Sequence, residues 1–181
     1  MPVMIYQILD QSNHAAITEL FTSVFTASEG EKEGTLIGKL ASELASTIDN
    51  DETISVGAFE NNTLVGAIFF TRLHFKHAIS VYMLAPVAIS DEHQGEGIGQ
   101  ALIKSGLNEL KKRSVHVAVT YGDPAFYSKV GFQALSENVL QAPQKLSMPF
   151  GWLGQSLTSE PIPVINERPM CVKAFNNPVY W

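Results

Sequence analysis

The sequence predicts an α/β fold, layered in the α+β manner, with antiparallel pairing in the middle of its sheet. Helix-like and strand-like apolar periods alternate along most of the chain, and three β-rich runs follow one another without a helix between them. The 181 residues, 45% of them hydrophobic, suffice for a buried core. We expect a single domain over residues 1–181, with a core at about 3–135 and a proline-rich extension at 136–181 packed on it.

The first half of the chain predicts one strand, two helices and a run of three strands. These elements are expected at residues 3–9, 12–25, 36–44, 53–60, 63–75 and 78–90. Ser12 or Asn13 can cap the first helix. The apolar residues of that helix recur at helical spacing and should form its buried face: Ile17, Leu20, Phe21 and Val24. Asn61 and Asn62 suit a tight hairpin turn between two of the strands.

The second half predicts a helix from about residue 97, a strand at 115–121 and a short helix from 123. The long helix ends in basic residues, which complement the negative end of its dipole. The strand is continuously apolar and therefore typical of a buried central position. Asp123 can cap the short helix, Pro124 suits its first position, and Gly131 is a suitable stop.

The last quarter of the chain differs in composition, because six of the nine prolines lie after residue 140. Proline fixes φ and removes a backbone donor, so this segment should be mostly ordered loop. Residues 141–157 show no clean periodicity. The only good strand candidate is MCVKAF at residues 170–175, where we expect the late strand of the extension.

Composition excludes several classes of protein. The sequence has no run of 18 apolar residues and its start lacks the features of a signal peptide, so we expect a cytoplasmic protein without a membrane partner. The single cysteine, Cys171, can form no internal disulfide and gives no metal framework. A net charge of −6, with scattered basic residues, disfavours binding to nucleic acid.

The stretch AISDEHQGEGIGQALIKSGL, residues 88–107, passes from an apolar strand through a glycine-rich turn into a helix. A dinucleotide fingerprint is excluded because the third residue after Gly97 is Gln100 rather than glycine. A P-loop is excluded because Ile103, not glycine, precedes the Lys-Ser pair. The stretch still predicts an anion site, because the free N–H groups and the dipole of a helix N-terminus favour negative charge.

This stretch resembles the Q/R-x-x-G-x-G/A signature of the GCN5-related N-acetyltransferases, the GNAT superfamily, with Gln94, Gly97 and Gly99 at the signature positions. The later segment GDPAFYSKVGF resembles a second landmark of the family. The resemblance is specific over residues 84–132, follows the order of elements over 3–135, and is strongest to bacterial small-molecule-type members. It implies an acyl-CoA N-acyltransferase fold, with a mixed, mostly antiparallel central sheet flanked by helices.

The resemblance implies that acetyl-CoA is the co-substrate and that no metal is needed. It implies that the backbone of Val87, Ala88 and Ile89 aligns the pantetheine arm. It also implies that the pyrophosphate is held by the backbone amides of the turn: Gln94, Gly95, Glu96, Gly97, Ile98 and Gly99. Pro86 independently supports this reading, because it cannot donate to a sheet ladder and predicts a bulge or broken pairing.

The chemistry implied is direct attack of an amine on the acetyl thioester in a ternary complex. Tyr127, at the family's tyrosine position, is the candidate acid for the leaving thiol, with aromatic packing as the alternative. Glu29, Glu31 and Glu33, expected in the turn between the first two helices, are candidates for binding the acceptor or relaying its proton. A solvated acidic loop is the alternative for these three.

The sequence therefore predicts an acetyl-CoA-dependent N-acetyltransferase whose acceptor is an amine on a small molecule. Two alternatives stay open: a protein or peptide N-acetyltransferase, and a noncatalytic acyl-CoA-binding or sensing module. The aromatic residues of the extension could line the acceptor pocket, form a homodimer face or simply pack in the core. They are Phe150, Trp152, Tyr180 and Trp181.

Overall fold

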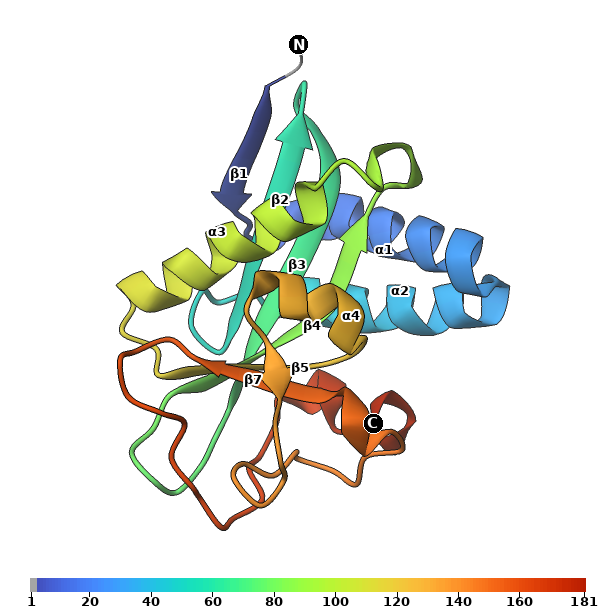
Figure 1. Ribbon diagram of the computed structural model, residues 1–181. Helices are drawn as coiled ribbons and strands as arrows, with labels where there is room; N and C mark the ends of the chain where they lie inside the picture. Colours follow the sequence, from blue (N-terminus) through green and yellow to red (C-terminus); the bar gives the residue numbers. More distant parts are fainter. Residues whose placement is uncertain (1–2) are drawn as a thin grey trace. The chain divides into compact units, whose positions relative to one another are not determined.

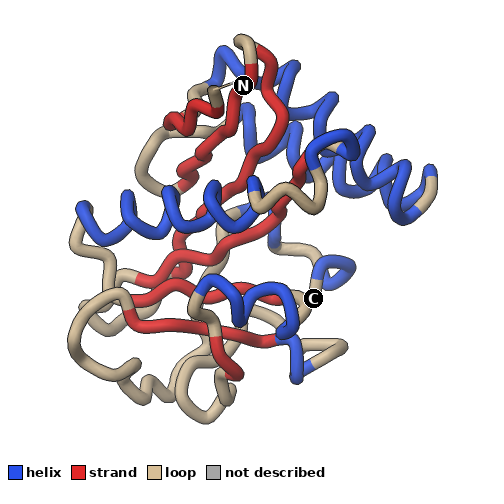
Figure 2. The backbone as a smooth tube through the Cα atoms, turned by 45° about the horizontal axis from the view of Figure 1, so that its top comes forward, coloured by secondary structure: helices blue, strands red, loops and turns tan. Residues whose placement is uncertain are grey.

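The computed structural model describes residues 3–181 and alternates helices with the strands of a mixed sheet (Figures 1 and 2). Its main elements are β1 (Met4–Ile8), α1 (His14–Glu29), α2 (Glu31–Ser46), β2 (Thr53–Glu60), β3 (Thr63–Leu73), β4 (Val81–Ile89), α3 (Ile98–Lys112), β5 (Val117–Tyr121), α4 (Pro124–Tyr127), β6 (Gln133–Ala134) and β7 (Trp152–Ser156). Within this described part of the chain, no helix is long and apolar enough to cross a membrane.

The seven strands of residues 3–181 follow the order β1-β2-β3-β4-β5-β7-β6. β1 pairs antiparallel with β2, β4 pairs parallel with β5, and β7 pairs antiparallel with both β5 and β6. Between β2 and β3, Asn61 and Asn62 have φ of 49° and 64°, the left-handed backbone of a tight hairpin turn. The predicted fold class and hairpin are therefore confirmed.

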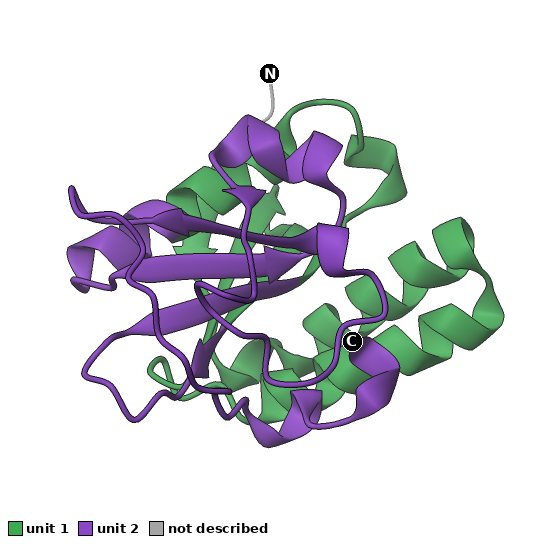
Figure 3. Ribbon diagram, turned by 60° about the horizontal axis from the view of Figure 1, so that its bottom comes forward, with its two compact units in different colours: residues 1–70, 86–106 green, residues 71–85, 107–181 purple. Residues whose placement is uncertain are grey.

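The chain divides into two compact units, shown in Figure 3. The first comprises residues 1–70 and 86–106, and the second comprises residues 71–85 and 107–181. β3, β4 and α3 each contribute residues to both units. The single domain expected over residues 1–181 therefore stays a prediction.

In the first unit, α1 and α2 lie side by side as an antiparallel pair (Figures 1 and 2). Two glycines of α2 face two threonines of α1 at very short range. A Cβ on Gly34 would lie 1.8 Å from Thr26 Oγ1, and a Cβ on Gly38 would lie 2.1 Å from Thr22 Oγ1. The close approach of the two helices therefore depends on glycine. The four apolar residues predicted for the buried face of α1 are all buried.

In the second unit, β5 lies between β4 and β7. Its register runs from Val117 to Thr120 against β4 and from Val117 to Tyr121 against β7. The predicted buried, central position of this strand is therefore confirmed. β7 follows β6 in sequence yet lies between β5 and β6, so it completes the sheet through contacts that are distant in the chain.

The late strand of the extension is present, but its predicted position was wrong. It is β7, inside the segment expected to be loop, whereas MCVKAF contributes only an isolated bridge between Met170 and His74. Residues Lys173–Phe175 instead form a 3₁₀ turn, and the Trp181 indole N–H donates to the carbonyl oxygen of Phe175 at 2.8 Å. This turn and its indole contact replace the extended backbone that a strand needs.

Two local predictions near α1 also need correction. Asn13 holds the cap position of α1 as predicted, but its side chain makes no capping hydrogen bond to that helix. It accepts instead from the N–H of Asp10, and Asp10 caps a preceding 3₁₀ turn by accepting from the Ser12 N–H at 2.8 Å. The acidic segment expected as a turn is helical on both sides of Gly30, whose φ of 99° alone separates α1 from α2.

Candidate functional site

The C-terminal half of β4 leaves its parallel partner. The register with β5 runs from Val81 to Leu84 and ends two residues before Pro86. The interruption of pairing predicted from the proline is therefore confirmed on this side of the strand. Further along, in the first unit, the N–H of Ser90 donates to the carbonyl oxygen of Val65 at 2.8 Å, so the end of β4 remains attached to β3.

A glycine turn, residues 94–97, leads from β4 into α3. Gly95 and Gly97 have φ of 81° and 80°, and a Cβ at either would meet nothing within 4 Å. Glycine is therefore needed there for the left-handed backbone rather than for space. Gly99, already inside α3, has no positive φ. The first two glycines shape the turn, and the third belongs to the helix.

The side chain of Gln94 ties the glycine turn back to β4. Its Nε2 donates to the carbonyl oxygen of Ile89 at 3.0 Å and to Asp91 Oδ1 at 3.2 Å. Both bonds join residues close in sequence, so the amide closes the loop on itself. The N–H of Gln94 also donates within the loop, to the carbonyl oxygen of Asp91 at 3.5 Å.

A hydrogen-bonded chain of three side chains fixes the beginning of the same loop. His93 Nδ1 lies 2.7 Å from Ser90 Oγ, and His93 Nε2 lies 3.1 Å from Glu60 Oε2. The side chain of His93 is only 12% exposed. Glu60, the last residue of β2, covers the side chain of His93 and holds the beginning of the loop in place.

The glycine turn offers exposed backbone to a bound pyrophosphate, and the acidic residues of the loop, Asp91, Glu92 and Glu96, are exposed to solvent. The turn is exposed, its glycines leave open space around it, and the first turn of α3 contains no acidic residue. Glu96 is exposed, so water screens its carboxylate. Backbone N–H groups at a helix N-terminus are the donors that a phosphate group needs.

Tyr127, the last residue of α4, lies among aromatic rings in the second unit. Its ring centroid is 5.0 Å from that of Phe126 and 5.9 Å from that of Phe132, both edge to face. A Cβ on Gly122 would come within 2.7 Å of Tyr127 Cε2, so this glycine makes room for the ring. Burial raises the pKa of Tyr127 to about 12, the charge of Asp123 adds to this rise, and a hydrogen bond with Thr120 opposes it. The phenol is therefore neutral, and a hydrogen-bond donor, near pH 7.

The short helix that holds Tyr127 begins as predicted but ends at Tyr127, and the predicted stop, Gly131, ends the 3₁₀ turn that follows it. Asp123 Oδ1 accepts from the N–H of Ala125 at 2.9 Å, Pro124 opens α4, and Gly131 has a φ of 93° where the following 3₁₀ turn ends. Gln155 of β7, which sequence patterns do not single out, donates from Nε2 to the carbonyl oxygen of Val130 at 2.9 Å. It therefore steadies the turn that follows Tyr127.

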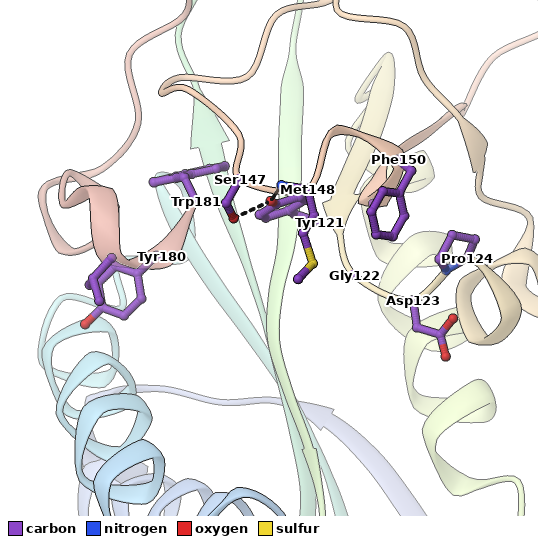
Figure 4. A pocket seen from close by; sticks show the side chains of 11 residues that line it. Tyr121, Gly122, Asp123, Pro124, Ser147, Met148, Phe150, Tyr180 and Trp181 are labelled. Carbon is purple, nitrogen blue, oxygen red and sulfur yellow. Dashed lines mark hydrogen bonds between the residues drawn. The ribbon is translucent and has the colours of Figure 1, made fainter.

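An aromatic pocket of about 530 Å³ opens at the end of β5 in the second unit (Figure 4). Its lining residues are Tyr121, Gly122, Asp123, Pro124, Ser147, Met148, Phe150, Gly151, Val179, Tyr180 and Trp181. Three of the four aromatic residues of the extension thus line a pocket. The fourth, Trp152, is buried and packs its ring 6.5 Å from that of Trp181. The sequence offered no reason to place Tyr121 beside them.

The structure places the three acidic candidates at helix ends in the first unit. Glu29 is the last residue of α1, while Glu31 and Glu33 lie in the first turn of α2. Glu29 and Glu31 are exposed and Glu33 is partly exposed. Glu31 and Glu33 also complement the positive end of the α2 dipole. Within residues 3–181, no group of His, Cys, Asp and Glu residues is arranged to hold a metal ion.

Comparisons with known proteins place this fold in one family. The family model described as Acetyltransferase (GNAT) domain matches residues 26–143. Over 167 residues the chain is 29% identical to YjhQ of Escherichia coli strain K12, an uncharacterized N-acetyltransferase, covering 87% of this chain and 86% of that protein.

Two solved structures share the fold. The GNAT family N-acetyltransferase YhbS from Escherichia coli, in complex with CoA, matches with a TM-score of 0.80 at 20% identity, over 98% of this chain and 94% of that one. A GNAT family acetyltransferase from Brucella melitensis, in complex with acetyl-CoA, matches with a TM-score of 0.69 at 23% identity, over 96% and 99%. Since the family model covers more than half of the chain, the protein belongs to the GNAT family of acetyltransferases and is an N-acetyltransferase.

Proposed function

We propose that the protein transfers the acetyl group of acetyl-CoA to the amine of a small molecule by direct attack. The observation that carries the proposal is the sequence of features along β4. Pairing with β5 ends at Leu84, and a glycine turn with left-handed Gly95 and Gly97 then opens α3. The bound CoA of YhbS and the bound acetyl-CoA of the Brucella melitensis structure support acetyl-CoA as the donor.

In this proposal, acetyl-CoA is recognised mainly by backbone groups. The backbone of Val87, Ala88 and Ile89 aligns the pantetheine arm, and the amides of residues 94–99 hold the pyrophosphate. Backbone N–H groups aimed at the thioester carbonyl would also stabilise the negative charge that develops on its oxygen. Such recognition needs little from the side chains, which agrees with the use of Gln94 and His93 inside the loop itself.

The reaction forms one C–N bond and breaks one C–S bond. The neutral amine nitrogen attacks the thioester carbonyl carbon, and the electron pair of the C–S bond leaves on sulfur. An acceptor that arrives as an ammonium ion loses two protons to solvent, and the CoA thiolate takes one proton from solvent, so that one proton is released in all. Of the two roles considered for Glu29, Glu31 and Glu33, we propose the relay of a proton to solvent.

Tyr127 is the proposed partner of the leaving sulfur. With a pKa of about 12 the phenol stays protonated at neutral pH and can donate a hydrogen bond to a thiolate. The raised pKa of Tyr127 also makes the phenol a poor proton donor to the CoA thiolate. Complete proton transfer to a thiolate whose conjugate acid has a pKa of about 8.5 is unfavourable, so Tyr127 stabilises the thiolate and solvent supplies the proton.

The test uses the purified full chain, isothermal titration with acetyl-CoA, and a CoA-release assay over a panel of amines and peptides. We expect acetyl-CoA to bind and CoA to be released with small amines. Gly97→Glu should weaken acetyl-CoA binding by about tenfold or more, because it strains the turn and adds a negative charge to an anion site. Gly30→Glu is the matched control, since Gly30 also has a positive φ and open space around it.

Each outcome distinguishes one alternative. Release of CoA with peptides alone would favour a protein or peptide N-acetyltransferase. Binding of acetyl-CoA without CoA release from any amine would favour a noncatalytic sensing module. Equal acetyl-CoA affinity of the two glycine variants would contradict the role given to the glycine turn.

A further inference from the structure

We infer that the acceptor is a primary amine attached to one aromatic or branched apolar body, which the aromatic pocket binds with the amine beside Asp123. The inference rests on the proposed function, because it names the acceptor of that reaction. It follows from the position, the polar groups, the walls and the charge of the pocket.

The position of the pocket connects it to the phenol proposed for the leaving sulfur. Gly122 lines the pocket and is also the residue against which the ring of Tyr127 packs. Asp123 and Pro124 line the pocket and open the short helix that ends at Tyr127. An amine beside Asp123 is therefore separated from Tyr127 by a single turn of helix.

The polar groups of the pocket floor are already paired with one another. The hydroxyl of Tyr121 accepts from the N–H of Met148 at 2.7 Å and lies 3.2 Å from Ser147 Oγ. The N–H of Gly122 donates to the carbonyl oxygen of Gly151 at 2.9 Å. A ligand with many hydroxyl groups would find these partners in use and would lose hydrogen bonds to water.

The walls of the pocket are apolar surface that a ligand can cover. Met148, Phe150 and Val179 are 57%, 70% and 56% exposed, although each is apolar. Behind them the ring of Tyr121 stacks on that of Trp181 with a centroid distance of 6.2 Å and an angle of 17°. Apolar walls with a few fixed polar groups and a volume of this size are typical of sites for small ligands.

The charge of the pocket limits the acceptor to one cationic group there. Of the eleven residues of the described chain that line it, Asp123 alone has a charged side chain. Figure 4 shows Asp123 and Trp181 on opposite sides of Tyr121 and Met148. A ligand with one ammonium group and one apolar body matches this arrangement, whereas a polyamine or an aminoglycoside would place further ammonium groups against apolar walls.

The first experiment compares kcat/KM at saturating acetyl-CoA for phenethylamine, isoamylamine, n-propylamine, spermidine, kanamycin and a lysine peptide. We expect phenethylamine and isoamylamine to exceed n-propylamine, spermidine, kanamycin and the peptide by about tenfold or more. Preference for a polycation or the peptide, with acetyl-CoA binding intact, would overturn the inference and leave the proposed acetyl transfer standing. Absence of CoA release from every amine would instead contradict the proposed function, and the inference would fall with it.

Variants then separate the apolar wall from the charge. Phe150→Ala should raise KM for phenethylamine by about tenfold and leave KM for n-propylamine within about twofold. Val164→Ala is its control, because Val164 is 71% exposed in the same unit and does not line the pocket. Asp123→Asn should raise KM for every amine, since asparagine keeps the cap of α4 and removes the charge.

A binding measurement that needs no turnover separates a loss of ligand binding from a loss of activity. We expect phenethylamine to quench the tryptophan fluorescence of the protein, because Trp181 lines the pocket, and to do so less strongly in Phe150→Ala. If Phe150→Ala weakens acetyl-CoA binding and leaves KM for phenethylamine unchanged, the pocket holds part of the donor and the inference is wrong.

Discussion

Replacement of Tyr127 by phenylalanine tests how the leaving thiol is stabilised. The pKa of about 12 exceeds that of a thiol, about 8.5, by roughly 3.5 units, so full proton transfer to the thiolate would cost roughly 5 kcal/mol. A hydrogen bond from a neutral donor to a charged acceptor contributes about 1.5 to 3 kcal/mol. Tyr127→Phe should therefore lower kcat by about 10- to 150-fold, with little change in the affinity for acetyl-CoA.

The assay is steady-state CoA release over pH 6 to 9 with the best amine of the panel. Because the phenol is protonated over this whole range, the variant should keep the shape of the pH profile and lose only its height. Tyr6→Phe in β1 is the matched control for the loss of a hydroxyl group.

Two results would refute this reasoning. A loss of kcat beyond about a thousandfold, together with a pH limb that vanishes in Tyr127→Phe, would mean that the phenol gives up its proton completely. A loss below about twofold in a stably folded variant would mean that the ring only packs beside Phe126 and Phe132.

The remaining predictions concern stability and the donor loop. The phenol of Tyr127 has a pKa near 10 in the unfolded chain and about 12 in the folded protein. Its contribution to the free energy of unfolding is therefore complete below pH 10 and is lost as the pH rises to 12. In urea titrations the free energy of unfolding of the wild type should fall by roughly 2 to 3 kcal/mol more than that of Tyr127→Phe over this interval. His93→Ala should raise KM for acetyl-CoA about fivefold or more, because it frees the loop that leads into the glycine turn. His116→Ala is the control, since it removes a histidine bonded to Ser80 and should leave this KM unchanged. Equal effects of the two variants would argue against a role of His93 in positioning the loop. Gly38→Ala should lower the free energy of unfolding by about 1 to 3 kcal/mol, because the new methyl group would collide chiefly with the Thr22 hydroxyl. Adding Thr22→Ala should restore most of this loss of stability. Additive losses in the double variant would contradict the explanation.

The elements that sequence patterns predicted are those specified by residues close together in the chain. The buried face of α1 follows from helical spacing, and the β2–β3 hairpin follows from two adjacent asparagines that tolerate a left-handed backbone. The short helix of Tyr127 follows in the same way from Asp123, Pro124 and Gly131. Each of these signals acts within a few residues.

The misplaced strand shows where local patterns fail. β7 contains only five residues, among them Gly154, whose Cβ would lie 2.9 Å from Leu135 Cδ2. It is a strand because β5 and β6 lie on either side of it, and strand propensity depends strongly on such neighbours. MCVKAF has better strand residues, yet its backbone pairs only at Met170.

The same distinction separates the proposed donor site from the proposed acceptor pocket. The glycine turn needs a left-handed backbone at Gly95 and Gly97, a requirement that neighbouring side chains barely alter, so a short motif suffices to predict the turn. The proposed acceptor pocket joins Tyr121 to Trp181, which lies far along the chain, and its chemistry depends on side chains. For this reason the glycine turn of the proposed donor site could be predicted from the sequence, whereas the places of Tyr121 and Asp123 in the proposed acceptor pocket could not.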